Sequence, residues 1–368
     1  MRILFALQLP PPVHGSSVVG KLIQEKFSRR SDIASSFVDI GISKNASDIG
    51  KFGLLKLWRI GVVIWTLLIR FLSFRPDRVY YAPTLTGFGF QKDFINVLLI
   101  KFLLKREGQI YLHLHNRGIS ELGEISSVKR RMYVYFFKSV KVILLSNHLY
   151  NDIKDFVSVD QIVVLPNGTK DLLPTAEKGF SKSGTQPMQI GYLSNLIISK
   201  GVLLLLDVLK ELHKNDYKFN CTIAGNESEL THVTLDSEIK KRGLADVVHY
   251  IGSVQGERKT LFFKNLDVFV FPTKYPLECM PLVLIEAASC GLPLICSDLG
   301  GIPDIVDKSN GFLIEVNQLT EGVYNALCQL YDSPRLVYEL GSNSRKVYEE
   351  KFTEEIFTRN IYDILTYP

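Results

Sequence analysis

The sequence has 368 residues, of which 46% are hydrophobic and 22% are charged. This length exceeds one ordinary core, so we expect a well-packed globular protein of two domains, each of roughly 150–200 residues. Residues 1–170 carry 24 Lys and Arg against 12 Asp and Glu, whereas the remainder carries 19 against 26. The basic half favours an anionic surface or substrate as its partner. No nucleic-acid-binding motif accompanies this charge, which argues against nucleic acid.

Five cysteines lie in the C-terminal half and form no Cys-x-x-Cys pair. Several lie within apolar runs, as expected for reduced thiols of a cytoplasmic protein. Because the sequence begins directly with a predicted strand at Ile3–Leu7, we expect no signal peptide. The sequence has no cluster of metal ligands and no Asp-x-Asp motif, so we expect neither a metal nor another cofactor.

Short apolar runs alternate with helical patterns along the sequence, which predicts doubly wound α/β domains. In the first half we predict strands at Ile3–Leu7, Ser36–Ile40, Arg78–Ala82, Gln109–Leu114, Lys141–Leu145 and Gln161–Leu165. In the second half we predict strands at Met188–Leu193, Phe219–Ala224, Val247–Ile251, Val268–Phe271, Leu292–Cys296 and Phe312–Ile314. Residues 171–187 are rich in Pro, Ser, Gly, Lys and Thr, and predict a linker between domains at 1–170 and 188–350. Two such domains would face each other across a ligand cleft.

The loop after the first strand reads Gln8-Leu-Pro-Pro-Pro-Val-His-Gly-Ser-Ser17 and precedes a helix that we expect to begin near Ser17. Three prolines stiffen this loop. Gly15 either lets a ligand approach the backbone or serves turn geometry alone. We interpret His14 as part of the loop structure or as a substrate contact, rather than as a catalyst.

The segment Leu54–Leu72 is the most apolar helical pattern of the first half. Its unbroken apolar core, Ile60 to Ile69, has ten residues, whereas a membrane span needs about 20. We therefore expect a buried helix. Its arginines and two tryptophans also suit a helix lying on anionic lipid, and the basic, aromatic segment Lys129–Lys138 has the same character. Peripheral membrane contact is the second hypothesis for this region.

Two histidines end the strand at Gln109–Leu114. Alternation along a strand places His113 and His115 on one face, with His115 nearest the carboxyl end, where α/β proteins bind ligands. No third metal ligand lies nearby in the sequence, so the pair is weak support for a metal site.

Residues 269–298 read as strand, loop, helix, turn and strand. Pro281 suits a helix start, and Gly291 can end that helix in a left-handed conformation. Glu278 precedes the helix and Glu286 lies on it, directed back toward its N-terminus. A helix N-terminus binds phosphate and a carboxylate accepts two hydrogen bonds, so the unit suits a nucleotide-sugar. Glutamates on an ordinary helix surface are the alternative.

The string Pro276-Leu-Glu-Cys-Met-Pro-Leu-Val-Leu-Ile-Glu286 resembles the Glu-x7-Glu motif of retaining glycosyltransferases with the GT-B fold, the large family 4 (glycosyl transferases group 1). Residues 297–306 also match that family. The resemblance implies two Rossmann-like doubly wound domains, the first for the acceptor and the second for the nucleotide-sugar donor. A final helix, about Thr353–Leu365 within residues 351–368, would pack back on the first domain.

The segment Gly191–Val202 resembles the family's phosphate loop, with Lys200 kept and Asn195 in place of the usual Arg. Asn donates hydrogen bonds but carries no charge, so one cation is lost. A solvated lysine at a helix start is the alternative for Lys200.

The resemblance implies the remaining roles. His115 would contact the donor sugar, Gly15 would face the diphosphate, and Glu278 and Glu286 would bind sugar and ribose hydroxyls. Catalysis would rest on His115, Lys200 and Glu278. Further donor contacts would come from two short stretches, namely Gly252 with Val254, and the consecutive residues Met280, Pro281 and Leu282.

We therefore expect a metal-independent, retaining glycosyltransferase that uses a nucleotide-diphosphate sugar and a saccharide acceptor. The basic first domain favours a lipid-linked acceptor at the inner face of the cell membrane, as in bacterial surface polysaccharide assembly. Two alternatives are a nucleotide-sugar epimerase and a catalytically inert protein that binds sugar nucleotides, the latter because of Asn195.

Overall fold

The computed structural model describes residues 1–42, 54–104, 109–123, 125–173 and 187–367. It consists of two compact units, Met1–Asn167 with Glu355–Pro368, and Gly168–Glu354. Each unit contains a parallel six-stranded sheet. Most of the predicted linker lies outside the described residues.

The sheet of the first unit has the strand order β2-β1-β3-β4-β5-β6. In that order the strands are Ala34–Asp39, Arg2–Leu7, Arg78–Tyr81, Ile110–Leu114, Lys141–Leu144 and Ile162–Val164. Its helices are α1 (Gly15–Phe27), α2 (Leu54–Phe74), α3 (Gly87–Leu104), α4 (Ser127–Phe137) and α11 (Glu354–Thr366).

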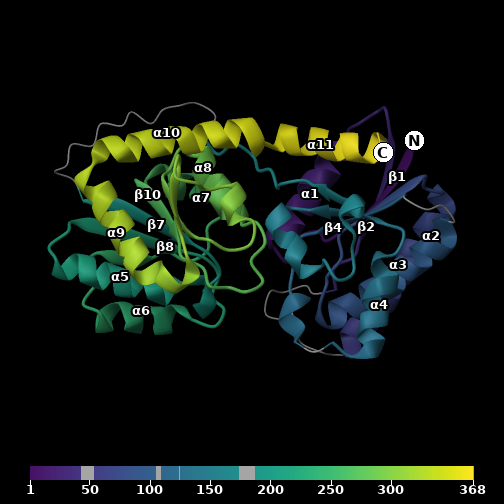
Figure 1. Cartoon of the computed structure of the whole chain (residues 1–368), viewed down its shortest axis with the longest axis horizontal. Helices are drawn as coiled ribbons and strands as arrows, with labels where there is room; N and C mark the ends of the chain where they lie inside the picture. Colours follow the sequence, from purple (N-terminus) through teal and green to yellow (C-terminus); the bar gives the residue numbers. More distant parts are fainter. Residues whose placement is uncertain (43–53, 105–108, 124, 174–186, 368) are drawn as a thin grey trace. The chain divides into compact units, whose positions relative to one another are not determined.

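Helices cover both faces of this sheet, as the burial of its strands requires (Figure 1). On one face, α2, α3 and α4 form a single hydrophobic core with alternate strand residues such as Leu4 and Leu112. The side chains at the intervening positions of each strand point to the other face. There Phe5 contacts Phe27 of α1, and His113 lies near Phe357 of α11.

The sheet of the second unit has the strand order β12-β11-β10-β7-β8-β9. In that order the strands are Gly311–Ile314, Leu294–Ser297, Val268–Phe271, Met188–Leu193, Phe219–Ala224 and Val248–Tyr250. Its helices are α5 (Val202–Lys214), α6 (His232–Lys241), α7 (Glu257–Lys264), α8 (Leu282–Ser289), α9 (Leu319–Asp332) and α10 (Pro334–Lys351). Helices α5, α6 and α9 form one hydrophobic core with the strands, while α7, α8 and α10 lie across the sheet from α5 and α6 (Figure 1).

All twelve predicted strands are present, with bounds that differ by two residues at most. The two sheets are not alike in order, however. The second has the Rossmann order, in which the direction of winding reverses between β7 and β10. The first has the flavodoxin-like order, in which it reverses between β1 and β3, with one further strand at its end.

Two local predictions differ from the structure, the first by only two residues. The helix expected near Ser17 begins at Gly15, because His14 caps it: the His14 ring accepts from the Ser17 amide, and the Ser17 hydroxyl accepts from the His14 amide. The helix at Leu54–Leu72 is not buried all round, since Trp58 and Trp65 are exposed. One side of α2 packs on the sheet while the other faces solvent.

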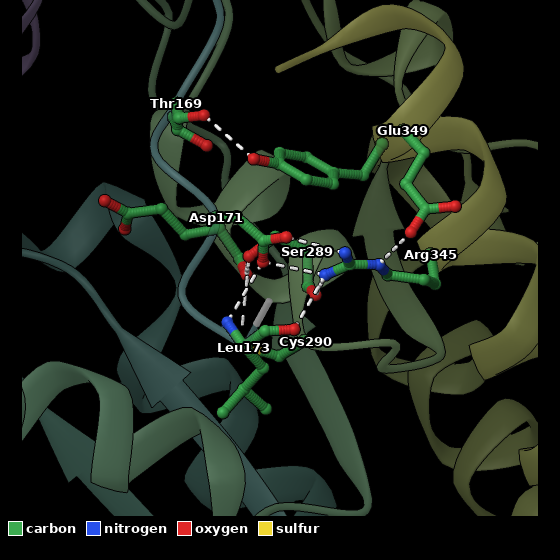
Figure 2. Close-up of polar contacts among 9 residues, drawn as sticks. Thr169, Asp171, Leu173, Ser289, Cys290, Arg345 and Glu349 are labelled. Atoms are coloured by element: carbon green, nitrogen blue, oxygen red, sulfur yellow. Dashed lines mark hydrogen bonds and ion pairs between the residues drawn. The ribbon is translucent and has the colours of Figure 1, made fainter. Parts of the chain in front are cut away.

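The chain enters the second unit through a segment that Arg345 of α10 holds in place (Figure 2). The Arg345 guanidinium binds both oxygens of Asp171, at 2.7 and 2.6 Å, and donates to the carbonyls of Leu173 and Ser289. Its Nε donates to Glu349 Oε1 at 2.6 Å. Ser289 ends α8, so one side chain joins α10, α8 and the entering segment.

Candidate active site

The candidate site of the second unit lies at the switch point of its sheet, where the order in which the chain adds strands reverses. β7 and β10 are neighbours, and ligands of such sheets bind beyond the carboxyl ends of the strands at this point. Lys200 comes from the loop after β7 and Glu278 from the loop after β10. Lys200 Nζ lies 2.5 Å from Glu278 Oε2, and the two side chains are only 14% and 8% exposed. The sequence predicted both residues, and the structure brings them into contact.

Aromatic and hydroxyl groups from the β10 loop surround this ion pair. Lys200 Nζ lies 4.5 Å from the centre of the Tyr275 ring and 5.6 Å from that of Phe271, within the range of cation–π attraction. The Thr273 hydroxyl donates to Glu278 Oε2 at 3.3 Å. The Glu278 carboxylate oxygen is therefore held by an ammonium and a hydroxyl together.

Two glycines allow close backbone packing around this ion pair. Gly201 has a φ of 90°, and a Cβ there would lie 2.1 Å from the carbonyl oxygen of Pro272. Gly300 has a φ of 59°, and a Cβ there would lie 2.4 Å from the carbonyl oxygen of Glu278. A side chain at Gly201 would push the Lys200 backbone away from the β10 loop, and one at Gly300 would displace the backbone of Glu278 itself.

Glu286 lies on α8 and is paired with Lys259 of α7. Lys259 Nζ lies 2.8 Å from Glu286 Oε1. Glu286 is 7% exposed, and its Oε2 is buried with no hydrogen-bond partner among the described residues. Burial raises the pKa of this carboxyl, while the charge and hydrogen bond of Lys259 oppose the rise. One oxygen of a held carboxylate is thus free to accept a hydrogen bond.

The other predicted donor residues of the second unit lie in loops and at a helix start. Asn195 is exposed, and its Oδ1 accepts from Asn226 Nδ2 at 3.1 Å. The Gly252 carbonyl accepts from the Gly225 amide at 3.0 Å, and Val254 is buried. Hydrogen bonds thus connect the β7 loop to the β8 loop at Asn195 and the β8 loop to the β9 loop at Gly252.

The helix α8 begins at Leu282, directly after the buried residues Met280 and Pro281. The sequence predicted that Pro281 lies within the first turn of this helix. In the structure Pro281 instead comes directly before that turn. A proline side chain cannot accept a hydrogen bond, so the first amides of α8 have no capping side chain. Gly291 has a φ of 65° after the helix, as predicted.

In the first unit, His113 and His115 share one face of β4, with ring centres 4.1 Å apart. The Tyr80 hydroxyl hydrogen-bonds His113 Nδ1. Burial lowers the pKa of His113 well below its ordinary value. Burial and the nearby His14 lower the pKa of His115 to about 3. Both rings are therefore neutral at physiological pH.

Gly15 is the first residue of α1, next to His14. Its φ lies outside the left-handed region, and a Cβ there would meet nothing within 4 Å. Local backbone geometry does not require glycine at this position. The alternative that the sequence left open, a glycine serving turn geometry alone, is therefore disfavoured.

Among the described residues, no group of three His, Cys, Asp or Glu side chains is arranged to hold a metal ion. The expectation of a metal-independent enzyme stays a prediction. None of the helices in the part of the chain that the structure describes combines the length and hydropathy of a membrane span.

Comparison with known proteins places these residues in a family. Residues 175–347 match the model of the glycosyl transferases group 1 family, and this segment includes Lys200, Glu278 and Glu286. The chain is a glycosyltransferase, and residues 175–347 carry its match to group 1. An uncharacterized glycosyltransferase of Methanocaldococcus jannaschii is 25% identical over 273 residues, which cover 72% of this chain and 71% of the relative.

A second relative carries a specific name. The UDP-Gal:alpha-D-GlcNAc-diphosphoundecaprenol alpha-1,3-galactosyltransferase of Escherichia coli is 26% identical over 303 residues, covering 69% of this chain and 75% of the relative. Among solved structures, the Anabaena protein HepE in complex with UDP superimposes with a TM-score of 0.75 at 20% identity over the full length of both chains. The fold of this glycosyltransferase is therefore GT-B, as the sequence predicted.

Sequence reasoning missed three side chains of the glycosyltransferase site. Thr273 and Tyr275 lie in the loop between β10 and α8. In the sequence, the only sign of a functional role for them is that they follow a buried strand. Lys259 lies 27 residues before Glu286 on another helix. No motif indicates it, because the pairing of α7 with α8 is made by the fold.

Proposed function

We propose that this glycosyltransferase transfers a sugar, with retention at the anomeric carbon, from a nucleotide-diphosphate donor to a lipid-linked saccharide. One observation carries the proposal: Lys200 and Glu278 form a largely buried ion pair at the point where a Rossmann-order sheet reverses. A cation and a carboxylate side by side suit a donor that presents phosphate and sugar hydroxyls side by side.

On the donor side, Lys200 would neutralise the departing diphosphate, and the amides at the start of α8 would add hydrogen bonds to it. Asn195 would contribute a hydrogen bond but no charge. Glu278 would bind hydroxyls of the transferred sugar, and the free Oε2 of Glu286 would accept from the ribose. The ion pair of Glu286 with Lys259 supports this last role, because it leaves one carboxylate oxygen available.

The proposed reaction is an attack on the same face from which the leaving group departs. The bond from the anomeric carbon to the diphosphate oxygen breaks, and a bond to the acceptor oxygen forms on that face. The acceptor proton passes to a diphosphate oxygen, so no side chain needs to act as a base. His115, which is neutral, would contact the donor sugar, while its carbonyl would stabilise the developing positive charge on the sugar.

Two observations support a lipid-linked acceptor. The Escherichia coli relative is named for transfer to a sugar on diphosphoundecaprenol. Residues 1–170 of this chain carry twice as many basic as acidic residues, which suits an acceptor at an anionic membrane. We place the reaction in bacterial surface polysaccharide assembly, at the cytoplasmic face of the membrane.

The test is Lys200→Ala, assayed by mass spectrometry of products from a panel of nucleotide-sugars with a lipid-linked acceptor. Loss of one leaving-group contact should lower turnover about 100-fold or more, with folding retained. The matched control is Lys210→Ala, an exposed lysine of α5. Near-normal turnover of the Lys200 variant would remove this residue from the mechanism.

The same assay separates the alternatives. An epimerase would convert the donor in the absence of acceptor and would consume none when acceptor is added. An inert protein would bind the donor without transfer or hydrolysis. Either result for the unmodified chain would contradict the proposed transfer.

A further inference from the structure

One side of helix α2 exposes large apolar side chains to solvent. Trp58 and Trp65 are 66% and 63% exposed. The exposed set recurs at spacings of four and three residues, which places it on one side of the helix. Its members are Trp58, Val62, Trp65, Ile69 and Leu72. Val63, Leu67 and Phe71 on the opposite side lie in the core against the sheet, so packing within the unit does not account for the exposed set.

Neighbouring helices extend this surface. α2 packs beside α3, and α3 packs beside α4 (Figure 1). Because all three bury their inner sides in one hydrophobic core, their outer sides face the same way. Phe102 of α3 is 74% exposed on that outer side. We call the five exposed residues of α2, Phe102 of α3 and the exposed Arg70, Arg130 and Arg131 of α2 and α4 the α2–α4 face.

The charges on these helices have one sign. The sequences of α2 and α4 contain no carboxylate. The single carboxylate of α3, Asp93, is buried and lies 2.8 Å from the ammonium of Lys92. Arg70, Arg130 and Arg131 are exposed. The apolar surface is therefore accompanied by cations, which is the combination that an anionic lipid surface complements.

A partner of another chemistry fits these features less well. A second copy of the chain would bring the same cations together, and like charges in contact are unfavourable. Tryptophan side chains favour the boundary between headgroups and acyl chains, and arginine can extend its charge to phosphate from beside an apolar surface. Because the opposite side of α2 is packed in the core of the unit, its exposed apolar residues, which run along 15 positions, would lie along the bilayer plane rather than cross it.

We propose that the α2–α4 face binds an anionic lipid bilayer, with Trp58 and Trp65 inserted at the level of the headgroups and Arg70, Arg130 and Arg131 against lipid phosphates. This contact would present the first unit to a lipid-linked acceptor and in that sense deepens the proposed function. It depends on the exposure and charge of the first unit, not on the donor chemistry of the second.

The chain offers a direct probe, because Trp58 and Trp65 are its only two tryptophans. Vesicles of phosphatidylglycerol and phosphatidylcholine in equal parts should shift the tryptophan emission to shorter wavelength, and brominated acyl chains should quench it. Vesicles of phosphatidylcholine alone should bind more weakly, and added salt should release the protein. Sedimentation with the mixed vesicles but no change in emission would overturn the assignment of the face.

Variants separate the contributions of the apolar residues and the cations. Trp65→Glu should lower binding to the mixed vesicles at least tenfold, and removal of each cation, as in Arg130→Ser, should lower it about fivefold. Val233→Glu, at an exposed apolar position of α6 in the second unit, is the matched control and should leave binding unchanged.

Two readouts distinguish failure of this inference from failure of the proposed function. Titration with nucleotide-sugar should give the same affinity for Trp65→Glu as for the unmodified chain, which also shows that the variant is folded. A chain that is dimeric without lipid, and monomeric as Trp65→Glu, would overturn the proposal in favour of a self-association surface. Transfer to a water-soluble acceptor without vesicle binding would likewise overturn it and leave the transferase function standing.

Discussion

The two lysine–glutamate pairs of the active site differ in environment. Lys200 and Glu278 lie against aromatic rings, and each is positioned for a different part of the proposed donor. Lys259 is more exposed than Lys200, at 25% against 14%, and Glu286 Oε2 is a buried oxygen with no partner among the described residues. Because the Lys259 ammonium forms an ion pair with Glu286, we infer that Lys259 is a positioning residue that keeps this carboxylate ionised.

Replacing Lys259 by Met should therefore weaken donor binding about tenfold at pH 7, because a buried carboxylate without its cation ionises less readily. The raised pKa of Glu286 implies that donor affinity falls as the pH falls through that pKa. Loss of Lys259 should raise the pKa further, so the fall should move to higher pH. Calorimetric titration with nucleotide-sugar across a pH series measures both effects.

Lys264→Met, at an exposed position of the same helix, is the control for this series. Lys259→Arg keeps the charge and should restore most of the affinity and the original pH dependence. A Lys259→Met variant with weaker binding but an unshifted pH dependence would argue for a purely structural role.

At the scale of elements, the Arg345 contacts connect parts of the chain that are distant in sequence. Asp171 and Arg345 are 174 residues apart, yet their side chains form a two-pronged ion pair (Figure 2). Asp171, with Glu349, raises the pKa of the guanidinium. The planar fork of arginine satisfies two carbonyls and two carboxylates at once, which a lysine ammonium cannot do in this geometry.

Arg345→Lys should accordingly destabilise the second unit by about 1–3 kcal/mol, the range for hydrogen bonds to charged groups. Arg335→Lys provides a matched control, since Arg335 also lies on α10 and also pairs with a glutamate four residues on, but at an exposed position. That change should alter stability by no more than about 0.5 kcal/mol. Denaturant unfolding, monitored by hydrogen exchange in β10 and β11, measures the change in unfolding free energy for both variants. Equal effects of the two variants would show that the Asp171 contact contributes little.

At the scale of the whole molecule, the two units differ in the environment of their histidines. His113 and His115 of the first unit have lowered pKa values. The described histidines of the second unit, His213, His232 and His249, are exposed. Acid should therefore act unequally on the two units.

The direction follows from proton binding. In the unfolded chain a histidine takes up its proton near pH 6.5, whereas the folded first unit keeps His115 neutral down to about pH 3. The unfolded state thus binds more protons in this window, and stability falls as the pH falls below about 6.5, by up to about 1.4 kcal/mol per pH unit for each histidine.

Hydrogen exchange at pH 7 and pH 5 should reveal this loss in β3 and β4, with no matching loss attributable to histidine in β7 and β10. His115→Gln removes one of the titrating groups and should make the dependence on pH shallower in the first unit. A first unit equally protected at both pH values would contradict the assignment of neutral histidines to the folded state.

Sequence by itself determined the twelve strands, since a strand buried on both faces requires a short apolar run whatever surrounds it. It also determined the family, because the Glu278 to Glu286 string and the phosphate loop hold their spacing within single local units. The sequence also indicated Lys200, although the contact with Glu278 required two loops to meet.

Only the tertiary structure decided the rest. The sequence of an apolar helix does not show whether one of its sides is buried or both. The exposed side of α2 could therefore be identified only from the structure, in which the other side packs on the sheet. Lys259 and Arg345 form ion pairs with carboxylates of other structural elements, and such contacts cannot be predicted from sequence spacing. These pairings depend on strand order, which is settled by the packing of helices on both faces of each sheet.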